Sequence, residues 1–85
     1  MSFKKYKHVI DSVYYASIEV MNHDRTEDDL KHTRTYSRGK LDGIRLCILM
    51  NDDLSSPEKE NLEIYIETIK EKISINYSDL MRRIT

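Results

Sequence analysis

Residues 3–22 decide the fold, and they read FKKYKHVIDSVYYASIEVMN. When the segment is plotted at about 100° per residue, apolar and small side chains collect on one side and charged ones on the other. Only Ile18 falls on the charged side. A strand over residues 13–21 is the alternative, because Val, Tyr and Ile favour sheets. Strict alternation fails at Tyr14-Tyr15, so we predict an amphipathic helix.

A second helix is predicted over residues 26–50. Thr26 has the chemistry of an N-cap, and three acidic residues follow it at the positive end of the helix dipole. An apolar stripe then runs through Leu30, Ser37, Leu41, Ile44 and Ile48. Because the segment Leu41–Met50 is apolar nearly all round, we expect it to be the most deeply buried part of the chain.

A third helix is predicted over residues 57–75. Ser56 is the expected cap, and Pro57 suits the first helical position. A coiled-coil-like seam follows at Leu62, Ile66, Ile69, Ile73 and Leu80, with Asn76 in the missing slot. Polar residues at Ser74–Ser78 leave open a break there, followed by a short helix over residues 79–84.

Length and composition agree with an all-α protein. The chain has 85 residues, with only two Gly and one Pro, and charged residues make up 34%. We therefore predict one helical domain over residues 1–85, built as a three-helix bundle or as a helical hairpin with an extra N-terminal helix. A core this small is marginal, because a short chain buries a smaller fraction of its surface than a long one.

The overall charge indicates which classes of partner the chain does not attract. The net charge is −1, which gives no bulk attraction to nucleic acid or to anionic membranes. No apolar run is long enough to span a bilayer, so we expect no membrane contact. Cys47 is the single cysteine, which excludes an internal disulfide and fits a cytoplasmic location. Its apolar neighbours predict that it is a small buried hydrophobe.

No catalytic, metal or cofactor site is predicted. The three histidines, His8, His23 and His32, are too far apart in sequence to share a turn. Glycine-rich phosphate loops and nucleophile motifs are missing from the sequence. The plentiful carboxylates do not single out an acid–base pair, so we expect no enzymatic activity and no cofactor.

Four residues are candidates for binding a partner protein. Gly39 and Gly43, followed by Cys47, make a small-residue face on the second helix, which favours either a binding contact or close packing inside the bundle. Internal packing is the interpretation that we favour for this face. Ile64 and Ile75 lie on the side of the third helix opposite its seam. Because a small core gains from burying more apolar surface, we predict a homodimer whose interface includes the third helix.

Basic residues on the second helix suggest nucleic acid as an alternative partner. Lys31, Arg34, Arg38 and Arg45 lie on one side of the second helix and could follow a phosphate backbone. Acidic residues interrupt this side, so nucleic acid is not the preferred partner. The function that the sequence favours is a small interaction protein that modulates or inhibits a partner protein, in the manner of a phage- or mobile-element-encoded regulator. A DNA-binding transcriptional regulator is the alternative.

Overall fold

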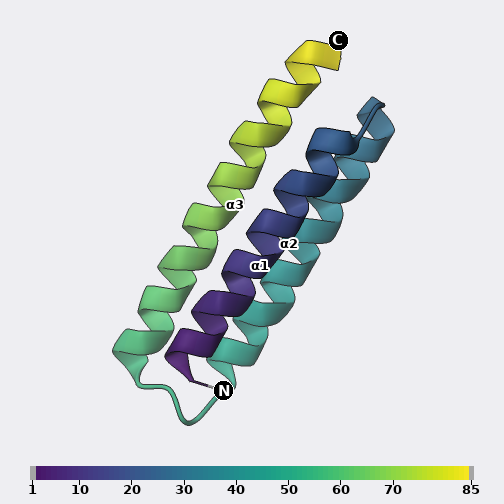
Figure 1. The fold of residues 1–85 in the computed structure, drawn as a ribbon. Helices are drawn as coiled ribbons and strands as arrows, with labels where there is room; N and C mark the ends of the chain where they lie inside the picture. Colours follow the sequence, from purple (N-terminus) through teal and green to yellow (C-terminus); the bar gives the residue numbers. More distant parts are fainter. Residues whose placement is uncertain (1, 85) are drawn as a thin grey trace.

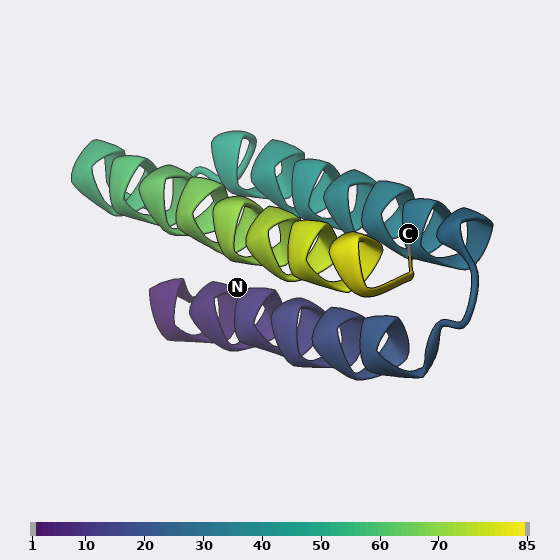
Figure 2. The ribbon, with the colours of Figure 1, turned by 90° about the horizontal axis from the view of Figure 1, so that it is seen from above.

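The computed structural model describes residues 2–84 and shows three helices joined by two short connections. Helix α1 spans Phe3–His23, α2 spans Glu27–Leu49 and α3 spans Ser56–Ile84. They run up, down and up (Figure 1), and from above each helix lies beside both of the others (Figure 2). The predicted all-α class and the three-helix bundle are confirmed, and residues 13–21 are helical rather than extended.

Each helix begins at a side-chain cap, so the start points follow from local sequence. The amide of Lys5 donates to Ser2 Oγ at 3.3 Å, and the amide of Asp29 donates to Thr26 Oγ1 at 3.1 Å. The cap of α3 is Ser55 and not Ser56 as predicted. Ser55 and Glu58 exchange two hydrogen bonds, each from a backbone amide to the other's side chain, as in a capping box.

The core lies along the axis where the three helices meet. It contains one apolar series from each helix, and α3 supplies the longest: Tyr6, Ile10 and Met21 from α1; Leu30, Leu41 and Ile48 from α2; Leu62, Ile66, Ile69 and Ile73 from α3. Leu54 from the connection between α2 and α3 joins them. The predicted seam of α3 is therefore confirmed in its first four positions. Leu80 packs against the core while remaining half-buried.

The expectation that Leu41–Met50 is the most deeply buried segment is wrong. Leu41 and Ile48 are fully buried and Ile44 is half-buried, but Leu46 is 61% and Met50 76% exposed. Cys47 is also exposed, contrary to the prediction that it is buried. A helix in a three-helix bundle can bury only the side that faces its two neighbours, so apolar residues on its other side stay in solvent.

Helix α3 continues without a break through Ser74–Ser78, and this resolves the alternative left open by the sequence. Both neighbouring helices hold this part of α3. Asn76 donates from Nδ2 to the sulfur of Met21 at 3.6 Å, and the Arg34 guanidinium lies 4.4 Å from the centre of the Tyr77 ring. Because of these contacts, the polar residues of this segment are accommodated within a continuous helix.

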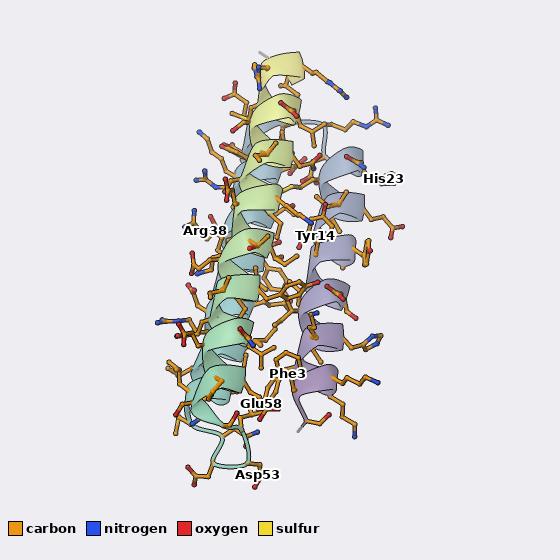
Figure 3. All side chains as sticks on the ribbon, turned by 90° about the vertical axis from the view of Figure 1, so that its left-hand side faces the viewer. Phe3, Tyr14, His23, Arg38, Asp53 and Glu58 are labelled. Atoms are coloured by element: carbon orange, nitrogen blue, oxygen red, sulfur yellow. The ribbon has the colours of Figure 1, made fainter. Side chains whose placement is uncertain are left out.

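The connection between α2 and α3 closes one end of the bundle. Figure 3 shows Asp53 in this connection, at the same end as Phe3 and Glu58 and opposite His23. Asn51 donates from Nδ2 to the Tyr6 hydroxyl at 3.0 Å, and its side-chain oxygen accepts from the amide of Asp53 at 2.9 Å. The two bonds fasten the connection to the start of α1.

Candidate functional site

A groove of about 390 Å³ runs between α1 and α2, and much of its lining is apolar. Its walls combine small and aliphatic side chains of α1 with polar and aromatic ones of α2: Val13, Ala16, Ser17, Val20, His32, Thr33, Tyr36, Ser37 and Lys40. Val20 is 50% and Tyr36 66% exposed. Lys40 is the one Lys, Arg, Asp or Glu among the residues that line the groove, and its ammonium lies 5.1 Å from the centre of the Tyr36 ring.

Two serines form the floor of this groove. Ser17 on α1 and Ser37 on α2 are buried, and their hydroxyl oxygens lie 2.6 Å apart. Each oxygen also lies within hydrogen-bond distance of the carbonyl four residues earlier in its own helix. The hydroxyls are therefore satisfied inside the bundle, and the floor presents no unpaired polar group to a ligand.

The solvent-facing side of α2 carries a second uncharged surface. We call it the outer stripe, and it consists of exposed residues on the side opposite the buried ones: His32, Tyr36, Gly39, Gly43, Leu46 and Met50. A Cβ atom added at Gly39 or Gly43 would meet nothing within 4 Å. The favoured interpretation that the two glycines permit close packing inside the bundle is therefore wrong.

Ile64 and Ile75 are exposed on α3, at 59% and 55%, on the side away from its seam. Their surroundings differ from those of the two glycines. Ile64 borders a hollow of about 620 Å³ between α2 and α3 that is lined mainly by charged side chains, whereas neither glycine borders that hollow. The four residues predicted to bind a partner therefore lie on two separate surfaces. The α2 pair belongs to an extended uncharged surface, and the α3 pair does not.

The basic residues of α2 lie on one side, as predicted, but two of the four are occupied within the chain. Arg45 Nε donates to Glu63 Oε1 on α3 at 2.9 Å, and Arg34 stacks on Tyr77. Lys31 and Arg38 are exposed. Figure 3 shows Arg38 projecting away from α1, on the side of the bundle formed by α2 and α3. Acidic side chains of α3 therefore lie beside the basic residues of α2.

Two carboxylates make contacts that change a pKa. The Tyr65 hydroxyl donates to Asp11, and this bond, together with burial, raises the pKa of Tyr65 to about 12. A hydrogen bond from Lys70 lowers the pKa of Asp42 below its usual value. Both contacts join two helices. Neither lies in the α1–α2 groove, so we assign them to the stability of the bundle rather than to a chemical step.

The three histidines all lie on the surfaces of helices. His8, His23 and His32 are all exposed, and the Nδ1 atoms of His23 and His32 lie 2.8 and 3.3 Å from carbonyl oxygens of their own helices. Within residues 2–84, His, Cys, Asp and Glu side chains do not gather into a group of three that could hold a metal ion.

Sequence reasoning did not identify Val20, Tyr36 or Lys40 as surface residues of interest. Val20 was assigned to the buried side of α1, because the pattern separates apolar from charged residues but does not say how wide the buried strip is. Tyr36 and Lys40 are four residues apart, a spacing that places them on one side of a helix, and this was the available signal.

None of the helices described in residues 2–84 is long and apolar enough to cross a membrane. Comparison of the chain with protein-family models, with curated proteins and with solved structures finds no match. The surfaces described above therefore carry the available information on function.

Proposed function

We propose that this protein is a small non-enzymatic interaction protein that binds a partner protein through the α1–α2 groove and thereby modulates or inhibits that partner. One observation supports the proposal above the others. The groove combines exposed apolar side chains with a nearly uncharged lining, whereas the larger hollow between α2 and α3 is lined by charges.

The chemistry of the groove favours an apolar segment of protein as the ligand. Val13, Ala16 and Val20 lie along one side of α1 at intervals of three and four residues, which is the spacing that receives the apolar side of another helix. Tyr36 supplies a large, stiff contact surface, and aromatic residues of this kind are enriched in protein interfaces. Burying the exposed side chains of Val20 and Tyr36 would remove apolar surface from water, which favours binding.

The proposal is tested by placing a photo-crosslinking amino acid at Ala16 in the groove and, as a matched control, at Glu71 on α3. Both positions are exposed on a helix surface. In the native cell, we expect a discrete crosslinked protein from position 16 that is missing from position 71. The crosslink should disappear when Val20→Glu is added, while circular dichroism shows an unchanged fold. Equal crosslinking from both positions, or no effect of Val20→Glu, would contradict the groove as the binding site.

A further inference from the structure

We infer that the outer stripe of α2 is the contact surface for a second copy of this chain, packed antiparallel about a twofold axis level with Leu41. This goes beyond the proposed function, because four of the six residues of the stripe lie outside the groove. His32 and Tyr36 border both surfaces, so a second copy and the partner protein would compete for Tyr36. The six residues of the stripe follow one another at intervals of 4, 3, 4, 3 and 4. That is the spacing of a coiled-coil seam, and here it lies on the side of α2 that is not needed for the core.

The stripe is self-complementary when it is reversed. Its six residues form three pairs, and the two members of each pair are equally far from position 41. The distance is two residues for Gly39 and Gly43, five residues for Tyr36 and Leu46, and nine residues for His32 and Met50. In an antiparallel pair, each glycine therefore meets a glycine. Tyr36 meets the partner's Leu46, and His32 meets the partner's Met50. A twofold interface requires this kind of match, because the same surface must fit itself.

In this arrangement the two glycines have a structural role, whereas the isolated chain shows none for them. Glycine is unfavourable in a helix interior, and both positions are open to solvent, with nothing close to an added Cβ. At the centre of an antiparallel pair they would let the two α2 backbones approach closely, as small residues do where helices cross. The large exposed residues Tyr36, Leu46 and Met50 would then cover one another at either end.

Charges beside the stripe are also arranged for this pairing. Arg38 and Asp42 lie on the same side of α2, one turn apart. Reversal about position 41 places Arg38 near the partner's Asp42 and Asp42 near the partner's Arg38. Each Asp42, which already accepts a hydrogen bond from Lys70 of its own chain, would gain a second cation at the interface. On the other side, Lys40 approaches the partner's Lys40, so one like-charged contact opposes two favourable ones.

The area that a stable dimer needs is a modest share of this chain's surface. A standard interface buries about 800 Å² on each partner, which is about one seventh of the 5801 Å² of this chain's surface. The bundle measures 45 × 16 × 15 Å between Cα atoms, so a contact along its length is long and narrow. Because position 41 is close to the middle of α2, the two bundles would overlap along most of their length.

Sedimentation equilibrium tests the dimer and its surface together. We expect wild-type protein, taken from micromolar to millimolar concentration, to reach twice the mass of the chain. Gly43→Glu should raise the dimer dissociation constant at least tenfold, since it places a carboxylate on the axis, and the open space at this position keeps the monomer folded. Ile64→Glu on α3 is the control and should leave the constant unchanged. It separates this surface from the α3 interface that the sequence analysis predicts. A monomer throughout, or dissociation by the control alone, would overturn the inference.

Disulfide trapping tests the direction of packing. In a Cys47→Ser background, His32→Cys and Met50→Cys are prepared as two separate proteins and oxidised alone and as a mixture. An antiparallel pair brings position 32 to the partner's position 50, so only the mixture should give a covalent dimer. Positions 32 of the two copies would lie about 27 Å apart, and disulfides need Cα atoms within about 7 Å. Covalent dimers from either protein alone, or from none of the samples, would refute the antiparallel register.

The two proposals fail separately. Val20→Glu lies in the groove and outside the stripe, and Gly43→Glu lies in the stripe and outside the groove. A protein that forms the dimer but gives no crosslink from position 16 would refute only the groove as a binding site. A monomeric protein that keeps its crosslink would refute only the dimer.

Discussion

Replacing both glycines of α2 by alanine should make the monomer substantially more stable. An alanine in a helix interior is more favourable than a glycine by about 1 kcal/mol, and the structure offers no opposing clash, because nothing lies within 4 Å of the added Cβ atoms. Gly39 and Gly43 are both exposed and within α2. We therefore expect Gly39→Ala/Gly43→Ala to raise the free energy of unfolding by about 2 kcal/mol. For a domain of this size that corresponds to a rise in Tm of about 8–16 °C.

Urea unfolding followed by circular dichroism at low micromolar concentration measures this change on the monomer. Ser78→Ala is a suitable control, because Ser78 is exposed on α3 and already has a side chain, and its gain should be about 0.5 kcal/mol or less. An unchanged or lowered midpoint for the glycine variant would show that the outer side of α2 is packed against other residues of the chain. That result would refute both the exposure of the stripe and the reason given for its glycines.

Four further outcomes are expected. Ile48→Ala, at a fully buried position, should cost about 2–5 kcal/mol, whereas Leu46→Ala, at a position 61% exposed, should change stability by about 0.5 kcal/mol or less; equal costs in urea unfolding would contradict the burial described. Ser17→Ala and Ser37→Ala should each lose a hydrogen bond of about 1 kcal/mol and recover roughly half through helix propensity. The double variant should be nearly neutral, and a double-mutant cycle without coupling would argue against the serine pair. Tyr65 should ionise near pH 12; since the folded protein holds this proton more tightly, the bond to its carboxylate partner stabilises fully below about pH 10 and is lost as the pH rises through 12. Ultraviolet difference titration of Tyr65→Phe against wild type checks this, and an unchanged titration above pH 11 would contradict it. Duplex DNA should not bind tightly at physiological salt, because the net charge is −1, and fluorescence anisotropy that shows submicromolar, salt-sensitive binding would favour the regulator instead.

Much of the fold could be predicted because it depends on residues near one another in sequence. Helical geometry alone explains why the apolar residues of 3–22 share one side of a helix. It also explains the seam that begins at Leu62. The cap at Thr26 depends on a side chain and an amide three residues apart. The cap of α3 was misplaced by one residue, since Ser55 and Ser56 have the same chemistry and only their backbone conformation distinguishes them.

The candidate site was predicted less well, because exposure depends on what other helices cover. The apolar end of α2 contains Leu41, Leu46, Ile48 and Met50, and their composition alone indicates burial. In the bundle, α1 and α3 cover only one side, so two of the four are buried and two are in solvent. The same geometry leaves Gly43 open, although its spacing from Gly39 suggested internal packing.

The sequence by itself determined that the chain forms three helices and which side of each is apolar, since periodicity and capping are local properties of a polypeptide. Only the tertiary structure decided how much of each apolar side is buried. Val20 and Leu46 belong to apolar series, yet each lies beyond the reach of the neighbouring helices and stays exposed. The surfaces left over by packing are the ones available for binding, and their positions follow from the arrangement of all three helices together.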